Sequence, residues 1–356
     1  MTTNPAPLLP TLAELTARAR ADLRIGLPVG IGPWLAVALE GLQPARLAAL
    51  RALGPVQIVL TGWRAETLKI AAYDGEVVRL ELPPDADSQQ LRALADPALD
   101  LAFPLKGPWR PLRAGDAEPA RLAVALAKSA QLLPALLMVQ AAAPQGLTAL
   151  PVAGLGRQLA AASVMAQVSA ASVPLAGGRS RLHVFRPDDG EAEHYAIEIG
   201  DPPRDRPVLA RLHSACFTGD VLGSLKCDCG PQLHAALAAM GEVGAGVLLY
   251  LNQEGRGIGL ANKMRAYALQ DQGFDTVDAN HRLGFEDDER DFRIGAALLR
   301  KLGFDSVRLM TNNPRKLAMM QAQGIDVAER VPLVVPPNPF NRNYLATKAH
   351  RSGHLL

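Results

Sequence analysis

Cysteine is scarce in this sequence, and its scarcity excludes a disulfide-stabilised fold. The 356 residues contain three cysteines, an odd number that would leave one thiol over after pairing within the chain. All three, Cys216, Cys227 and Cys229, lie within a stretch of fourteen positions. This clustering indicates that the three thiols act together.

Long hydrophobic runs and an excess of one charge are also lacking. The longest apolar run, around residues 132–144, contains Pro134 and Gln140 and is too short to span a bilayer. The N-terminal residues lack the basic start and apolar stretch of a signal peptide, so we expect a cytoplasmic protein with reduced thiols. The formal net charge of +2 favours neither nucleic acid nor a membrane as partner, so an anionic substrate must be bound by local clusters.

Histidine is missing from the first half of the chain. All seven histidines begin at His183, whereas the three tryptophans precede residue 110. Metal and acid–base chemistry is therefore predicted in the second half. A length of 356 residues suggests two domains. We expect an N-terminal domain over 1–145, a linker over 146–178 and a catalytic domain over 179–356.

The hydrophobic pattern predicts helices alternating with strands, which favours an α/β fold. In the first half it indicates a helix over 12–23, strands over 55–62, 68–73 and 77–84, and helices within 118–143. The small-residue-rich linker is expected to be partly helical. In the second half the pattern indicates a hairpin around Asp189-Gly190, strands over 208–213, 247–251 and 306–310, and helices starting at Pro231, after 259, over 288–303 and after 312.

The three cysteines are best interpreted as metal ligands. Three thiolates with a fourth position left to water form a catalytic zinc pattern, whereas structural zinc sites usually have four protein ligands. Cys227 and Cys229 are separated by one residue, which is closer than in zinc fingers. A structural zinc site would need His213, His234 or a carboxylate as fourth ligand, and buried cysteines without metal are a further alternative.

Five segments of the second half closely resemble, in their usual order, the signature segments of GTP cyclohydrolase II, an enzyme family of riboflavin synthesis. They are RLHSACFTGDVLGSLKCDCGPQLHAAL, YLNQEGRGIGLANKMRAYALQDQGFDTVDAN, LGFEDDERDF, LMTNNPRK and SGHLL. The resemblance covers residues 171–356 and implies a mixed sheet with flanking helices, preceded by a smaller α/β domain. It also implies a homodimer that uses Zn²⁺, and Mg²⁺ with the triphosphate, to convert GTP into 2,5-diamino-6-(5-phosphoribosylamino)pyrimidin-4(3H)-one, formate and pyrophosphate.

The resemblance assigns a role to each matching residue. Cys216, Cys227 and Cys229 match the zinc ligands, Tyr267 assists hydrolytic steps at the ring, and Asp288 is a general base. Arg290 acts at the α-phosphate as a nucleophile or stabiliser, and we favour stabilisation because a guanidinium stays protonated. The implied GTP contacts are Arg211, Leu212, His213, Ser214, Ala215, Gln232, Glu254, Gly255, Arg256, Thr276, Thr311 and Lys316.

One motif has alternative interpretations, another suits phosphate, and two positions depart from the family pattern. EGRGIG (254–259) lacks the G-x-G-x-x-G spacing of a dinucleotide site, and outside the resemblance it is a tight turn. TNNPRK (311–316) joins a strand to a helix, an arrangement that presents backbone N–H groups to phosphate. Ala215 and Asn252 stand where the family often has glutamate and arginine, which affects the expected metal and phosphate contacts.

The role of the first half is open. ADLRIGLPVGI weakly resembles the opening of the domain that makes dihydroxybutanone phosphate, but that domain depends on an acidic cluster and histidine, which this half lacks. We therefore expect a degenerate or unrelated domain with a structural or interaction role. Alternatives for the whole chain are an enzyme that stops after ring opening, a zinc-stabilised nucleotide-binding regulator and a bifunctional riboflavin enzyme.

Overall fold

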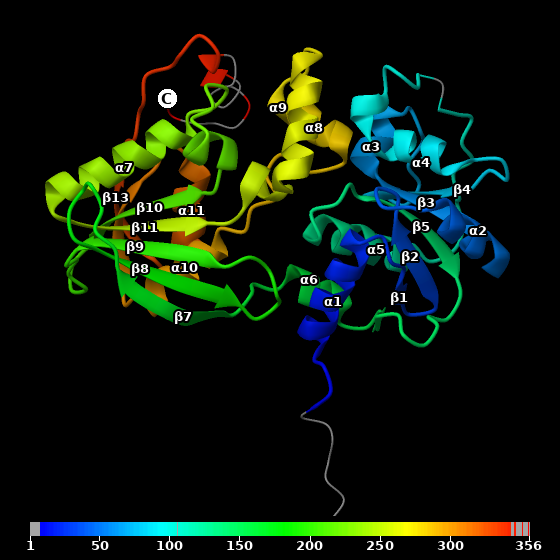
Figure 1. Cartoon of the computed structure of the whole chain (residues 1–356), viewed down its shortest axis with the longest axis horizontal. Helices are drawn as coiled ribbons and strands as arrows, with labels where there is room; N and C mark the ends of the chain where they lie inside the picture. The colour runs from blue at the N-terminus through cyan, green and yellow to red at the C-terminus, as the bar shows by residue number, and fades with distance from the viewer. Residues whose placement is uncertain (1–7, 105, 343–344, 347–350, 352–354, 356) are drawn as a thin grey trace, which may run out of the picture. The chain divides into compact units, whose positions relative to one another are not determined.

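The structure is a computed structural model that describes residues 8–104, 106–342, 345–346, 351 and 355. Two compact units make up the chain: Met1–Ala161 with Ala261–Glu289, and Ala162–Leu260 with Arg290–Leu356 (Figure 1). The chain passes from the second unit back to the first within helix α8 (Gly259–Asp271). Of the SGHLL motif, only Leu355 lies within the described residues.

The first unit contains a six-stranded sheet in the order β4-β3-β5-β2-β1-β6. Neighbouring strands are antiparallel, except that β1 and β6 run parallel. Its strands are β1 (Val29–Ile31), β2 (Trp34–Ala38), β3 (Val56–Thr61), β4 (Val77–Glu81), β5 (Ala135–Gln140) and β6 (Ala149–Leu150). Its helices, besides α8, are α1 (Leu12–Arg24), α2 (Pro44–Leu53), α3 (Gly62–Thr67), α4 (Ser88–Ala95), α5 (Glu118–Ser129), α6 (Leu155–Ala160) and α9 (Thr276–Leu283).

Helices α1, α5 and α6 share a buried core with strands of this sheet. Helix α1 begins at a capping box, in which Thr11 accepts a hydrogen bond from the Glu14 N–H and the Glu14 side chain accepts one from the Thr11 N–H. Helix α9 is capped at its start by Asp275, whose carboxylate accepts from two helical N–H groups, and at its end by Gly284, which has a left-handed conformation (φ 89°). Both ends of α9 are therefore fixed by local sequence.

The second unit contains a seven-stranded mixed sheet in the order β13-β12-β10-β11-β9-β8-β7. Its strands are β7 (Met165–Ser172), β8 (Ser180–Pro187), β9 (His194–Gly200), β10 (Val208–Ser214), β11 (Ala245–Leu251), β12 (Ser306–Met310) and β13 (Asp326–Val331). Strands β13, β12, β10 and β11 are parallel, and β9, β8 and β7 continue the sheet in antiparallel pairs. The α/β class expected from the sequence is confirmed.

Helices cover both faces of this second sheet (Figure 1). Helix α7 (Cys229–Val243) packs on one face, where Ala236 and Met240 share a core with Leu209 and Leu248. Helices α10 (Arg293–Lys301) and α11 (Pro314–Ala322) supply the core on the other face. Strands covered on both faces carry apolar residues in both registers, which is why β10 is buried over six consecutive residues from Val208.

The predicted strand over 68–73 is wrong. Helix α3 ends at Thr67, and the N–H groups of Leu68, Lys69 and Ile70 donate to carbonyls of its last turn. Lys69 adopts a left-handed conformation (φ 58°), which no strand accommodates. Short-range hydrogen bonds that close the helix thus take the donors that a sheet would need.

Three helix predictions need correction. The expected helices within 118–143 include α5, but residues 135–140 form β5 between β2 and β3, because a short apolar run buried on both faces has no diagnostic period. The helix expected from 288 begins at Arg293, where the Asp291 carboxylate accepts from the Arg293 N–H (2.9 Å) and guanidinium. Helix α7 begins at Cys229, so Pro231 is its third residue.

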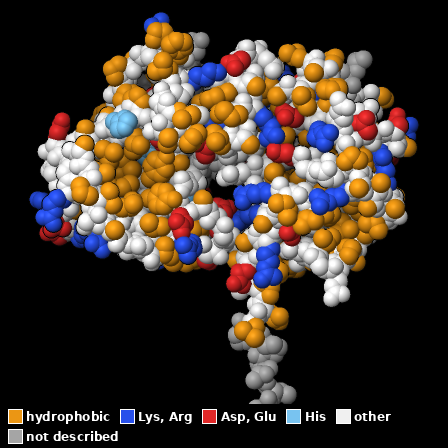
Figure 2. All heavy atoms as spheres, viewed as in Figure 1, with side chains coloured by type: hydrophobic (Ala, Val, Ile, Leu, Met, Phe, Trp, Pro, Cys, Tyr) orange, Lys and Arg blue, Asp and Glu red, His pale blue; other side chains and the backbone are white. Residues whose placement is uncertain are grey.

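Two observations bear on partners. Among the described residues, none of the helices combines the length and the apolar character that crossing a membrane requires. Basic and acidic side chains are interspersed over the face shown in Figure 2.

Candidate metal and nucleotide site

The candidate residues of the second unit lie where parallel strands end. Strands β10, β11 and β12 run parallel and end at Ser214, Leu251 and Met310. The next residues are the cysteine loop, the glycine-rich turn and the TNNPRK motif. The carboxyl ends of parallel strands share one sheet edge, where α/β proteins bind ligands.

The three cysteines form one cluster. Their ligand atoms lie within 4.8 Å of one another, and the Sγ atoms of Cys216 and Cys227 are 3.7 Å apart. Two thiolates on a tetrahedral Zn²⁺, with Zn–S bonds of about 2.3 Å, lie about 3.8 Å apart. Cys216 and Cys227 are buried, whereas Cys229 is half-buried. The donor set therefore fits zinc, with protein ligands for three of four positions.

Local backbone brings the sulfur atoms together. A Cβ on Gly219 would lie 2.8 Å from the Cys227 Sγ and 3.1 Å from the Cys216 Sγ, so a larger residue would displace the thiols. Cys229 is the first residue of the 15-residue helix α7. The partial positive charge at a helix N-terminus favours the thiolate form that binds metal.

Asp220 organises the cysteine loop, and sequence analysis did not select it. Its carboxylate accepts from the Cys216 N–H (2.9 Å), the Tyr250 hydroxyl (2.9 Å) and His213 Nε2 (3.0 Å). Burial and the negative charge of Asp220 raise the pKa of Tyr250, which keeps its hydroxyl a donor. Two of these partners, His213 and Tyr250, come from strands β10 and β11, so the local sequence does not indicate them.

His213 and Arg211 each keep a buried nitrogen without a partner among the described residues. Burial lowers the pKa of His213, and because the Asp220 carboxylate accepts from Nε2, the Nδ1 atom is left as an unpaired acceptor. Arg211 donates to the Met310 carbonyl (2.9 Å) and to Gln232, but its Nε is unpaired. Burial lowers the pKa of Arg211 to about 10, so it stays charged at neutral pH.

Basic side chains converge on the end of β10. Arg290 Nη1 donates to the Ser214 hydroxyl (3.3 Å), and Lys316 Nζ donates to the Leu212 carbonyl (3.0 Å). Both cations lie over the Phe292 ring, at 4.8 Å and 4.9 Å from its centroid. The structure thus brings these two predicted phosphate ligands together beside the predicted β10 contacts.

The glycine-rich turn is linked to the cysteine loop. The Glu254 carboxylate accepts from the Phe217 N–H, directly after Cys216, and from the Gly255 N–H (2.9 Å). Gly255 and Arg256 both have left-handed backbone conformations (φ 64° and 63°), which is uncommon for a residue with a side chain. Ala215 joins the same edge because its N–H donates to the Leu251 carbonyl (2.7 Å).

Gln253 is a second residue that sequence analysis did not select. Its Nε2 donates to the Asp291 carbonyl (2.9 Å), and its Oε1 is buried without a partner among the described residues. Its position between two motif residues, Asn252 and Glu254, is the signal that would have indicated it.

The TNNPRK motif is held by its own side chains. The buried Thr311 accepts from the Asn313 N–H (3.1 Å), and Asn313 caps α11 by accepting from the Arg315 N–H (2.9 Å). Asn312 exchanges two hydrogen bonds with the backbone of Leu333. The strand-to-helix junction expected from the sequence is present in the form predicted.

Three predicted residues belong to the first unit. Tyr267 lies on α8, with Lys263 Nζ 5.7 Å from its ring centroid. Thr276 is the first residue of α9 and accepts from Gln270 (3.3 Å). Asp288 follows α9 and is half-buried. The other predicted residues belong to the second unit.

Asn252 stabilises the second unit through a hairpin. Its N–H donates to Nδ1 of His194 (3.0 Å), and its side chain donates to the Glu193 carbonyl. Burial lowers the pKa of His194 to about 4, against the opposing effect of the nearby Asp189 and Asp291 charges. The residue that departs from the family pattern thus anchors the glycine-rich turn to the start of β9.

Acidification is expected to destabilise the protein through His194. The folded pKa of His194, about 4, lies below its unfolded pKa of about 6.5. The neutral ring therefore stabilises the folded state above about pH 6.5, and this stabilisation is lost as the pH falls from about 6.5 to about 4. Between about pH 7 and pH 4.5 the loss is about 2–3 kcal/mol. Urea unfolding of the protein and of His194→Gln at both pH values measures it, and equal losses of stability in the two proteins would contradict the expectation.

Fold and site together define an α/β enzyme whose parallel strands end at a cluster able to hold a metal ion. Comparison with known proteins gives the family. Residues 166–332 match the model of the family described as GTP cyclohydrolase II. A curated GTP cyclohydrolase-2 from Azospirillum brasilense is 46% identical over 357 residues, covering 96% of this chain and 91% of that relative. The chain belongs to the GTP cyclohydrolase II family, an enzyme family of riboflavin biosynthesis, and the recognition made from its motifs is confirmed.

Other relatives match different shares of the chain. A GTP cyclohydrolase-2 from Cronobacter sakazakii is 55% identical over 190 residues, which are 53% of this chain and 96% of that relative. A solved two-domain 3,4-dihydroxy-2-butanone 4-phosphate synthase from A. baumannii, RibBX, covers 90% of this chain and 99% of its own, with 16% identity and a TM-score of 0.31.

Proposed function

We propose that this chain catalyses the zinc-dependent hydrolysis of GTP to 2,5-diamino-6-(5-phosphoribosylamino)pyrimidin-4(3H)-one, formate and pyrophosphate, the first step of riboflavin biosynthesis. The observation that carries the proposal is the three-thiolate cluster, whose 3.7 Å sulfur separation suits zinc. Family membership supports the nucleotide substrate. The unpaired polar atoms of Arg211, His213 and Gln253 support a polar ligand at the same strand ends.

Cys216, Cys227 and Cys229 would hold the zinc ion. Bound zinc supplies a water of lowered pKa and a Lewis acid for attack at C8 of guanine and release of formate. Cys216 and Cys227 are buried, and Asp220 holds the loop between the first and second cysteine through the Cys216 N–H.

The remaining roles are those that the resemblance implies. Tyr267 and Asp288 move protons during ring hydrolysis, a task worth about 10²–10⁴ in rate for a positioned group. Arg290 and Lys316 stabilise negative charge on the phosphates, and Mg²⁺ accompanies the triphosphate. Thr311 and Thr276 complete the nucleotide contacts that the resemblance implies.

The guanine base is recognised by the glycine-rich turn in this proposal. The Glu254 carboxylate is an acceptor suited to guanine N1–H and N2–H, and Arg256 is a donor for an acceptor or phosphate. Glu254 already binds two backbone N–H groups, which fixes the carboxylate before substrate arrives. Gln232, which Arg211 contacts, is the remaining polar candidate.

Organisation and location complete the proposal. We infer a cytoplasmic homodimer in which residues 179–356 form the catalytic domain, residues 146–178 a linker and residues 1–145 a domain without catalytic residues of its own. The absence of histidine from the first half supports the last point.

Product analysis tests the proposed function. The purified protein is incubated with GTP and Mg²⁺, before and after zinc chelation, and formate and pyrophosphate are measured per GTP consumed. We expect one of each per GTP, and loss of both after chelation. Pyrophosphate or ring-opened product without formate would contradict the assignment, as would GTP binding without turnover.

A further inference from the structure

Residues 261–289, here called the returning segment, belong by sequence to the family match yet pack in the first unit. This segment carries Tyr267, Thr276 and Asp288, three of the predicted site residues. Its partners within the unit come from the N-terminal part of the chain, for which no role is assigned. The contacts fall into three groups, at the start, the middle and the end of the segment.

The first group holds helix α8. Arg265 forms ion pairs with Glu40 (2.9 Å) and Asp96 (3.0 Å), and Asn262, fully buried, donates to the Gln131 carbonyl (2.9 Å). Glu40 is itself fixed because it accepts from the Leu133 N–H (3.0 Å). Because the Arg265 guanidinium is planar and has two carboxylate partners, these ion pairs fix its orientation as well as its position. Tyr267 lies two residues beyond Arg265 on this helix.

The second group holds helix α9. The rings of Trp63 and His281 stack at 3.8 Å and 6°. A Cβ on Gly284 would lie 2.6 Å from the Thr61 Oγ1 and 2.9 Å from a Pro134 carbon, so the backbone that ends α9 touches the N-terminal part directly. This close approach leaves no room for a side chain at position 284.

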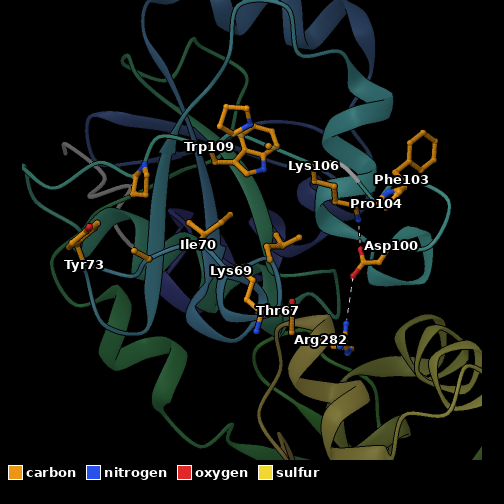
Figure 3. A pocket seen from close by; sticks show the side chains of 15 residues that line it. Thr67, Lys69, Ile70, Tyr73, Asp100, Phe103, Pro104, Lys106, Trp109 and Arg282 are labelled. Atoms are coloured by element: carbon orange, nitrogen blue, oxygen red, sulfur yellow. Dashed lines mark hydrogen bonds and ion pairs between the residues drawn. The ribbon is translucent and has the colours of Figure 1, made fainter.

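An ion pair beside a cavity adds to this group. Asp100 accepts two hydrogen bonds from Arg64 (2.7 Å and 2.8 Å) and lies 4.0 Å from Arg282 of α9. Figure 3 shows Arg282 reaching towards Asp100 at the edge of a cavity of about 670 Å³, with Lys106 on the other side of the carboxylate. The pair links α9 to a carboxylate that is already fixed.

The third group holds the loop that carries Asp288. Lys128 Nζ, on α5, donates to the Glu289 carboxylate (2.7 Å), and Glu286 lies within 3.9 Å. The same Glu289 oxygen accepts from the Glu286 N–H (2.9 Å). Phe285, 1% exposed, lies 5.8 Å below the Lys128 ammonium. Glu289 stands between Asp288 and Arg290. The contact with Lys128 therefore restrains the residue next to Asp288, the proposed base.

We propose that the N-terminal part of the chain is a positioning scaffold for the returning segment, with Lys128 as the positioning residue for Asp288. The inference rests on the proposed function, since it concerns the geometry of that reaction. A misplacement of about 1 Å at a reacting group costs on the order of 100-fold in rate. Lys128 touches no reacting atom in this proposal and acts through Glu289.

Steady-state kinetics of four variants test the proposal. In Lys128→Met and Glu289→Gln, kcat for formate release is expected to fall about 10–100-fold while KM for GTP changes less than about threefold. The double variant should lose no more than either single variant, because both remove one interaction. Lys128→Arg, which keeps the cation, should retain most of the activity.

The matched control is Arg121→Met on the same helix. Arg121 pairs with Glu118 and the Asp74 carbonyl, not with the returning segment, so this variant should keep normal kcat. Hydrogen exchange over 284–292 should rise in Lys128→Met and not in Arg121→Met, with zinc content and melting temperature unchanged. This readout is independent of turnover.

The outcomes separate the two proposals. Wild-type protein that releases no formate would refute the proposed function. An active wild type whose Lys128→Met and Glu289→Gln variants both keep kcat within about twofold would refute positioning alone. A fall in kcat that parallels a fall in melting temperature, without rescue by Lys128→Arg, would also refute it, because Lys128 would then contribute only to stability.

Discussion

A Cys227→Ser variant is expected to lose its bound metal and, with it, at least about a thousand-fold of its GTP turnover. Cys227 is buried, and its Sγ is 3.7 Å from that of Cys216. A serine hydroxyl is a far weaker zinc ligand than a thiolate and stays protonated at neutral pH. Two remaining thiolates would not retain zinc against a chelator, so the protein would lack the group that activates water.

Metal content and turnover must be measured on the same preparation. Zinc per chain by mass spectrometry should fall from about one to near zero, while circular dichroism stays close to that of the wild type. Ser224→Ala is the matched control, since Ser224 lies in the same loop and its hydroxyl accepts from the Lys226 N–H. A folded, metal-free Cys227→Ser protein with normal turnover would disprove the zinc mechanism.

Replacement of Arg290 by alanine is expected to lower kcat about 10²–10³-fold, the effect of removing one donor to a developing anion. Arg290 donates to the Ser214 hydroxyl (3.3 Å) and lies over the Phe292 ring, so its guanidinium is held at the end of β10. Arg290→Lys keeps the charge but loses the fork of donors. The kcat of Arg290→Lys should be about tenfold above that of Arg290→Ala if Arg290 acts electrostatically. It should equal that of Arg290→Ala if Arg290 forms a covalent intermediate.

Arg293→Ala provides the comparison for Arg290. Arg293 lies three residues later, and its guanidinium is turned to Asp291 (2.8 Å). It should keep kcat within about threefold of wild type. Equal losses in the two alanine variants, measured as pyrophosphate release, would show that Arg290 contributes to local folding rather than to charge stabilisation.

The sequence predicted the parts of the site whose residues are close along the chain. Cys216, Cys227 and Cys229 are near neighbours in sequence and form one cluster in the structure. The parallel order of β10, β11 and β12 explains why the motifs that follow them meet at one sheet edge. Local signals were sufficient here because strand ends and glycine-rich turns are encoded in short stretches.

Other features depend on contacts that sequence patterns do not report. Asp220 has partners from two strands, and its buried carboxylate is visible only once His213 and Tyr250 are placed. The sequence predicts a helix where β5 forms, because the apolar run of β5 is buried on both faces and shows no alternation of polar and apolar residues. The return of residues 261–289 to the first unit results from pairs such as Arg265–Glu40, which are separated by 225 positions.

The packing of Phe285 has a consequence for shortened forms of this chain. The ring, 1% exposed, lies beneath Lys128, an N-terminal residue, and Trp63 covers His281 nearby in the sequence. Separation of the chain after residue 161 would remove Lys128 and Trp63 from these two side chains. A form of this chain that lacks residues 8–161 is therefore expected to expose Phe285 and to leave His281 without its stacking partner.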